Sequence, residues 1–347
     1  MFRRVRPFRY VWTFVMEMNQ LIQAFPEQLQ EALAIGQQYT FKTAPKPFKN
    51  IVLAGLGGSG IGGSIVQNFV FDTITIPFWV NKEYTLPAFV DADSLVIACS
   101  YSGNTEETLV AAAEALQKGA TVVAVTAGGA LQQFCEQHDL DCMLVPSGMP
   151  PRACLGYSIV QLLYALRHFQ YIDGAFESDI RATSDLLKTN QSRYETIGRE
   201  LAEQLYQKLP IIYASGRMEG MAVRFRQQLN ENSKVLGWHG VIPEMNHNEL
   251  VGWRDVDDQR VVVLLRTPSD SERVVFRMEI NKDVYRQYTP HVLELMAEGT
   301  TFWEQLFSLV HMTDWCSVYL ADLRGVNATE VKVIDALKAK LNENPVV

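Results

Sequence analysis

The strongest constraint on the fold is a regular alternation of short apolar runs with helical patterns. It begins at residues 51–56, IVLAGL, which lead directly into the glycine-rich segment 57–63. Further apolar runs lie at residues 76–80, 95–100, 121–126 and 142–145. The segments between them, such as 105–118, have helical spacing. Short strands joined through helices predict a parallel sheet covered on both faces, so we expect a doubly wound α/β domain.

A weaker copy of the same pattern begins at Ile211. The run IIYASG aligns with IVLAGL when Ile211 is placed on Ile51, and the same offset places Gly220 on Gly60. Such a repeat predicts a second domain of the same fold, and a length of 347 residues also favours two domains. We therefore expect a tail and helical preface at residues 1–47, a first domain at 48–190 and a second at 191–347.

The composition excludes several classes of protein. The net charge of −8 argues against a nucleic-acid binder, and no apolar run reaches the roughly 18 residues of a membrane-spanning helix. Five scattered cysteines predict neither a disulfide framework nor a structural zinc site, so we expect a cytoplasmic location. Residues 1–15 contain four arginines but lack the features of a signal peptide. We interpret them as a frayed tail or as an extension upstream of a start at Met16 or Met18.

The glycine-rich turn after the first strand is the first candidate binding element. It contains Gly57, Gly58 and Ser59, and such a turn suits a sugar phosphate. It also fits the dinucleotide fingerprint, with Glu83 near the position of a ribose-binding acid. From this loop alone, the two ligands are about equally well supported, and a purely structural turn is a third explanation.

The next loop favours the phosphate. Ser100, Ser102 and Thr105 follow a buried strand and precede a helix, whose N-terminal N–H groups carry a partial positive charge. In an open parallel sheet, ligands lie where the loops at the carboxyl ends of neighbouring strands converge. An ordinary helix cap with incidental serines is the structural alternative. Two hydroxyl-rich loops at one sheet edge make a sugar phosphate the better interpretation, and no cofactor is expected.

Longer motifs make the resemblance to a known family specific. The pair GLGGSG and SYSGNTEET resembles the sugar isomerase (SIS) fold, and the later segments MPPRACLGYS, RQQLNENSK, EMNHNELVGW and SVYLADLRGVNATEVKVIDALK resemble the bifunctional phosphoglucose/phosphomannose isomerase family. The resemblance implies two SIS-type doubly wound αβα domains with parallel sheets, an N-terminal helical segment and a homodimer. It also implies metal-independent isomerisation of glucose 6-phosphate or mannose 6-phosphate with fructose 6-phosphate through a cis-enediolate.

This reaction requires a base and a positive group beside the developing anion. Glu231 is our candidate base, since a carboxylate at the end of a helix faces the negative end of the helix dipole, which disfavours its charge. Without the resemblance, a solvated glutamate would be the commoner explanation. Arg152 follows two prolines and is the candidate for stabilising the enediolate, with an ordinary arginine at a helix start as the alternative.

Three further residues are assigned through the resemblance alone. It implies that His247 acts in ring opening across a dimer interface, that Lys338 assists, and that Thr329 lies close to the sugar. His247 has two alternatives, an ordinary loop histidine or a metal ligand with His239, although a spacing of eight does not put the pair on one helical face. Neighbouring lysines of the same helix are alternatives to Lys338.

Other functions stay open at this point. A catalytically silent phosphosugar sensor is possible in principle, but the sequence has no basic segment with helix-turn-helix spacing. An isomerase of another phosphosugar fits the same loops, because they grip the phosphate rather than the sugar. A dehydrogenase would have to bind NAD.

Overall fold

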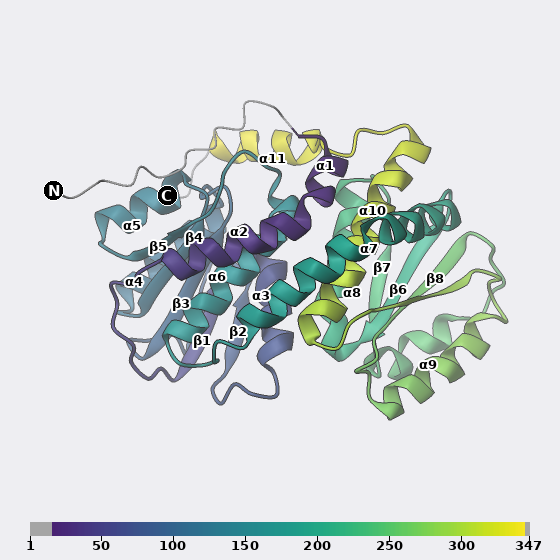
Figure 1. Ribbon diagram of the computed structural model, residues 1–347, viewed down its shortest axis with the longest axis horizontal. Coiled ribbons are helices and arrows are strands. Elements are labelled where there is room, and N and C mark those ends of the chain that lie inside the picture. The colour runs from purple at the N-terminus through teal and green to yellow at the C-terminus, as the bar shows by residue number, and fades with distance from the viewer. Residues whose placement is uncertain (1–15, 344–347) are drawn as a thin grey trace.

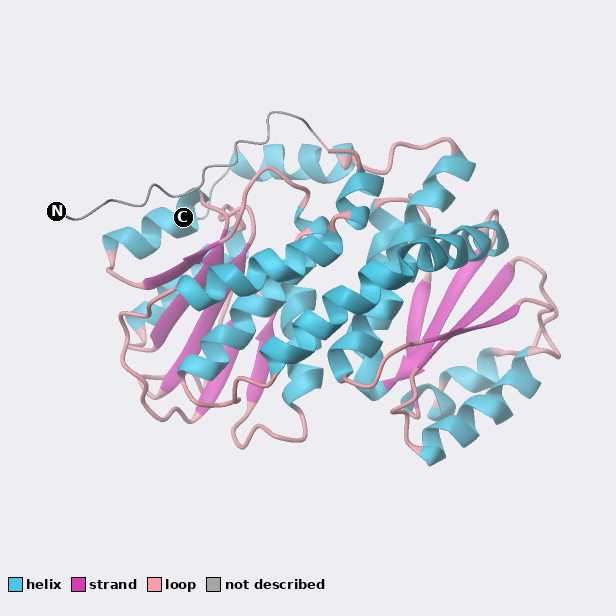
Figure 2. Ribbon diagram, in the orientation of Figure 1, coloured by secondary structure: helices cyan, strands magenta, loops and turns pink. Residues whose placement is uncertain are grey.

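The computed structural model describes residues 16–343, apart from the side chain of Asn342, and contains two β-sheets surrounded by helices (Figures 1 and 2). The first sheet has the strand order β2-β1-β3-β4-β5 and the second has the order β7-β6-β8-β9. All strand pairs are parallel. The prediction of two doubly wound α/β units is therefore confirmed. The arginine-rich segment 1–15 lies outside the described residues.

The secondary structure follows the predicted alternation along most of the chain. The strands are β1 (Asn50–Ala54), β2 (Phe78–Asn81), β3 (Ser94–Ser100), β4 (Thr121–Thr126), β5 (Asp141–Leu144), β6 (Leu209–Ser215), β7 (Trp238–Ile242), β8 (Arg260–Arg266) and β9 (Val292–Met296). The α-helices are α1 (Met18–Gln23), α2 (Phe25–Gln38), α3 (Gly57–Val70), α4 (Glu106–Gln117), α5 (Gly129–Gln137), α6 (Leu155–His168), α7 (Phe176–Leu205), α8 (Glu219–Glu231), α9 (Glu272–Tyr285), α10 (Phe302–Arg324) and α11 (Lys332–Asn342). Short 3₁₀ turns are η1 (Pro151–Ala153), η2 (Gly216–Met218), η3 (Glu244–His247) and η4 (Glu249–Gly252).

The predicted helical preface consists of two helices. Helices α1 and α2 are separated at Ala24, and Pro26 lies in the first turn of α2, where its missing N–H leaves no intrahelical bond unmade. Leu29 and Leu33 are buried on the face of α2 that packs against α6 and α7. The preface is thus part of the first domain's core.

Two elements of the structure are absent from the sequence-based expectation. The first is α7, a helix of 30 residues that packs along α10. Its buried residues, such as Ile180, Leu187 and Tyr194, recur at helical spacing within a predominantly polar sequence. Strand β7 was also missed, because it is an edge strand in which His239 and Gly240 interrupt the apolar pattern. No described helix is both long enough and apolar enough to cross a membrane.

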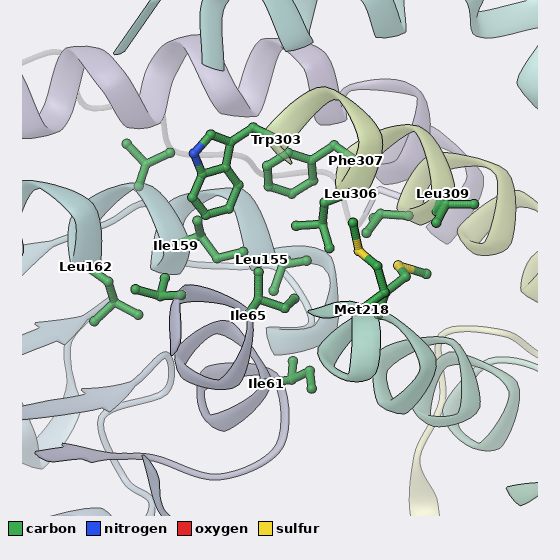
Figure 3. Close-up of a cluster of buried hydrophobic side chains, with 14 of the residues drawn as sticks. Ile61, Ile65, Leu155, Ile159, Leu162, Met218, Trp303, Leu306, Phe307 and Leu309 are labelled. Carbon is green, nitrogen blue, oxygen red and sulfur yellow. The ribbon is translucent and has the colours of Figure 1, made fainter. Parts of the chain in front are cut away.

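One hydrophobic core joins the two domains. Figure 3 shows Trp303 and Phe307 of α10 in the same cluster as Ile65 of α3, Ile159 of α6 and Met218 of η2. These side chains are at most 3% exposed, so the interface between the domains is packed like a protein interior. The loops at the end of the first sheet and the end of α8 are therefore held in a fixed relation to one another.

Candidate active site

The glycine-rich turn brings backbone N–H groups to the carboxyl edge of the first sheet. Helix α3 starts at Gly57, and its N-cap residue Leu56 provides no side-chain cap for the first turn. At Gly58 an added Cβ would lie 3.1 Å from the carbonyl oxygen of Pro151, so only glycine permits this close approach without a shift. The Oγ of Ser59 accepts a hydrogen bond of 3.2 Å from the backbone N–H of Tyr101. The turn thus contacts both the second loop and the η1 segment.

The hydroxyls of the second loop form a local hydrogen-bonded set. The Oγ of Ser100 donates to the Oγ1 of Thr105 at 2.8 Å and accepts from the N–H of Gly103 at 3.1 Å. The Oγ of Ser102 accepts from the N–H of Asn104 at 3.2 Å. Thr105 is the N-cap of α4, but its side chain makes no cap hydrogen bond, which leaves the first turn of α4 without one. Such a helix start is suited to an anion.

Arg152 connects η1 to the end of α8 and to the loop before α11. Its side chain is only 4% exposed, and its Nε donates to the Oδ1 of Asn232 at 2.6 Å. Its Nη1 lies 3.4 Å from the Oε2 of Glu231, and its Nη2 donates to the carbonyl oxygens of Ala328 and Thr329 at 2.7 and 2.8 Å. Burial lowers the pKa of the Arg152 guanidinium, and the nearby Glu231 carboxylate opposes this shift.

Glu231 is the last residue of α8, and its side chain is 28% exposed beside Arg152. The helix end is held by Lys234, whose Nζ donates to the carbonyl oxygen of Glu231 at 2.6 Å. The same ammonium donates to the carbonyl oxygens of Asn327 and Glu330 at 2.8 Å each. Burial lowers the pKa of Lys234, with a further contribution from Arg152. The end of α8 is thereby fastened to the loop before α11.

A buried ion pair supports Arg152 from behind. The Nη1 and Nη2 of Arg224 both donate to the carbonyl oxygen of Arg152 at 3.2 Å, and Nη2 also donates to the Oδ2 of Asp314 at 2.7 Å. Gln228 donates to the other Asp314 oxygen at 2.9 Å. Burial raises the pKa of Asp314, and Arg224 opposes this shift. Sequence reasoning missed these residues, although Arg224, Gln228 and Asn232 recur at a spacing of four along α8, on a face that is buried.

The structure groups most of the predicted site residues and leaves two apart. The Gly58 turn, Arg152, Glu231 and the Thr329 backbone form one connected cluster. His247, at the end of η3, and Lys338, on α11, are exposed residues outside this set of contacts.

A metal centre finds no support in the side chains that the structure describes. Between residues 16 and 343, no group of three or more histidine, cysteine, aspartate and glutamate side chains is placed to hold a metal ion. His239 lies on β7, next to η3 in the sequence, and burial lowers its pKa.

Comparison with known proteins adds to this geometry. Residues 47–146 match the SIS domain, and residues 195–341 match the bacterial phospho-glucose isomerase C-terminal SIS domain. A bifunctional phosphoglucose/phosphomannose isomerase of Caldicellulosiruptor bescii is 40% identical over 92% of this chain and 97% of its own length. A protein of the same name from Aquifex aeolicus is 34% identical over 86% of this chain and 92% of its own length.

Solved structures share the fold at low sequence identity. The C-terminal domain of glucosamine-fructose-6-phosphate aminotransferase from Francisella tularensis superimposes with a TM-score of 0.73 at 13% identity. The match covers 93% of this chain and all of that one. It therefore supports the arrangement of the two α/β units, and not a particular reaction.

Proposed function

Since this chain belongs to the bifunctional phosphoglucose/phosphomannose isomerase family, we propose that it interconverts glucose 6-phosphate and mannose 6-phosphate with fructose 6-phosphate. The single observation that carries the proposal is the contact of Arg152 with Glu231, at 3.4 Å, directly beside the Gly58 turn. Different segments of the chain thus bring a phosphate-binding loop, a guanidinium and a carboxylate together at one site.

The phosphate is held at the edge of the first sheet. In our proposal, the N–H groups of Gly57, Gly58 and Ser59 and the hydroxyls of Ser100, Ser102 and Thr105 bind its oxygens. The uncapped first turns of α3 and α4 add a partial positive charge on the same side. This arrangement orients the sugar without requiring a basic protein surface.

The proton transfer is assigned to Glu231. Its carboxylate removes the proton from C2 of the open-chain aldose, and the electron pair moves to form a cis-enediolate. The Arg152 guanidinium stabilises the negative oxygen, as a preorganised group at the position where charge develops. A proton moves from the O2 hydroxyl to O1, and Glu231 returns its proton to C1, which gives the ketose. The reaction is redox-neutral, and we propose that it needs no metal or cofactor.

We assign ring opening to His247 and Lys338, which lie outside the cluster, and tolerance of both C2 epimers to Thr329. We infer a homodimer in which His247 of the partner subunit acts on the ring oxygen, and this fits the exposure of His247. Lys338 assists from α11, and Thr329 lies near the sugar because its carbonyl oxygen is bonded to Arg152. The expected location is the cytoplasm.

The test follows hydrogen exchange at C2. The purified protein is incubated with fructose 6-phosphate in deuterium oxide, with and without EDTA, and the products are followed by NMR. We expect both aldoses to appear with deuterium at C2 under either condition. Binding of fructose 6-phosphate without exchange would instead favour a sensor, and loss of exchange in EDTA would contradict metal independence.

A single substitution tests the assignment of the base. Glu231→Gln should keep phosphosugar binding and lose exchange by roughly 10²–10⁴-fold, the usual contribution of a general base. Glu200→Gln, on the exposed face of α7, is the matched control and should exchange at the wild-type rate. Normal exchange in Glu231→Gln would show that another group is the base.

A further inference from the structure

The second sheet has its own equivalent of the substrate-binding edge. Strand β6 is flanked by β7 and β8 as β1 is flanked by β2 and β3, so the strand order reverses at β6 as it does at β1. Ligands of open parallel sheets lie outside the carboxyl ends of the strands at such a reversal. In the second domain, the corresponding loops follow Ser215 and Arg266.

A cavity of about 1080 Å³ lies at this edge, and we call it the second-domain cavity. Its lining includes Ser215 and Glu219 after β6, Thr267 and Asp270 after β8, and Gln305 of α10. The end of α3 also contributes to the lining, just as the end of α8 contributes Glu231 to the first site. The cavity is thus the internal counterpart of the proposed active site.

The charges of this cavity differ in sign from those of a phosphate site. At the repeat offset that places Ile211 on Ile51, Gly57 and Ser59 are replaced by Arg217 and Glu219. The charged lining residues are three carboxylates and one guanidinium, and the Arg217 guanidinium is already paired with Asp72. The net negative charge disfavours a phosphate and favours a cation.

Two buried polar atoms at this cavity have no hydrogen-bond partner in the protein. They are the Oγ of Ser215 and the Oε1 of Gln305, whose residues are 4% and 2% exposed. Buried polar groups are rarely left unpaired, because the loss of water contacts costs free energy. A ligand that brings hydroxyl or amine donors would satisfy both atoms.

The remaining wall is apolar. Phe69, Ile76 and Phe302 line the same cavity, so one face of a ligand can contact hydrocarbon while its polar groups face Ser215 and the carboxylates. A carbohydrate ring presents this combination of an apolar face and hydroxyl groups.

We propose that the second-domain cavity binds a small hydroxylated amine, with unphosphorylated amino sugars as the representative class. The carboxylates of Glu219 and Asp270 attract the ammonium group. Ser215 and Gln305 bind the hydroxyl groups. The site is distinct from the proposed active site and does not depend on the isomerase reaction.

The probe is D-glucosamine, titrated into the full-length protein by calorimetry in the presence of saturating fructose 6-phosphate, which occupies the first site. We expect binding of one equivalent, at least about fivefold tighter than that of D-glucose, which lacks the charge. Inorganic phosphate should not compete. Isomerase activity is measured on the same samples, so a failure of the proposed reaction is recognised independently.

Variants locate the site. Glu219→Gln and Ser215→Ala should each weaken D-glucosamine binding by about fivefold and leave isomerase activity unchanged. Glu200→Gln, the exposed control on α7, should bind as the wild type does. Glu219 is exposed, so its variant is expected to fold even if Ser215→Ala does not. The proposal is overturned by absence of binding up to roughly 10 mM in the presence of saturating fructose 6-phosphate, or by unchanged affinity in Glu219→Gln.

Discussion

Replacement of Asp314 by alanine should remove the support behind Arg152. The carboxylate is paired with Arg224 at 2.7 Å, and the two side chains are 8% and 3% exposed. Asp314→Ala would leave the Arg224 guanidinium buried without its carboxylate. Of the present acceptors of Arg224, only the neutral carbonyl oxygen of Arg152 would remain. Removal of one partner from a buried ion pair costs about 3–5 kcal/mol, so we expect a loss of that size in the free energy of unfolding.

A double replacement distinguishes the loss of the ion pair from the cost of leaving one charge buried without a partner. Arg224→Met combined with Asp314→Leu removes both charges, and such apolar exchanges are often neutral or stabilising. The double variant should therefore regain most of the lost stability. It should not regain activity, because the Arg152 carbonyl loses its two donors. A displacement of the guanidinium by about 1 Å is expected to lower kcat on the order of 100-fold.

Urea unfolding with linear extrapolation gives the stabilities, and the rate of aldose formation from fructose 6-phosphate gives kcat. Asp322→Ala is the matched control, since Asp322 lies on the same helix but is exposed, and its effect should stay within about 0.5 kcal/mol. The reasoning fails if Asp314→Ala costs less than about 1 kcal/mol, or if the double variant is no more stable than the single one.

Three further substitutions test other parts of the structure. Gly103 has φ of +69°, and an added Cβ would lie 1.7 Å from the carbonyl oxygen of Gly128, so Gly103→Ala should raise KM for fructose 6-phosphate, and an unchanged KM would contradict this. Burial lowers the pKa of His311 from 6.5 to about 4, so between these values the unfolded chain binds more protons, and stability decreases as the pH is lowered from 6.5 to about 4. The loss is on the order of 3 kcal/mol, and His311→Phe should flatten the pH dependence measured by urea unfolding. Lys234→Met removes the donor for four carbonyl groups and should cost about 1–3 kcal/mol, whereas unchanged stability would show that water replaces the ammonium.

The local pattern was sufficient to predict the parallel sheets. Apolar runs of about five residues mark β1, β3, β4, β6 and β8. These strands are buried on both faces, so their central positions are almost all apolar. The edge strand β7 has no such run, since only Ile242 is fully buried. The edge strands β2 and β5 were predicted because each still overlaps a short apolar run, at residues 76–80 and 142–145.

The sequence predicted the residues of the two binding loops, but not the hydrogen bonds that join distant segments at the candidate site. The glycines and hydroxyls of the two loops are visible because each loop directly follows a strand. The partners of Arg152 are not, since Asn232 lies 80 residues away in the sequence and Thr329 contributes its backbone carbonyl. Every residue type has a backbone carbonyl, so a replacement of Thr329 would not remove the acceptor of that one contact, and no sequence pattern encodes it.

The hydrophobic core in Figure 3 has a consequence for how ligand binding can be detected. Because Trp303 and Phe307 pack with residues of both domains, we expect the domains to melt together in a single cooperative transition. A ligand of either proposed site would then raise the same melting temperature through mass action. A thermal shift would show that a ligand binds but not at which site, so the two sites must be distinguished by competition and by substitution.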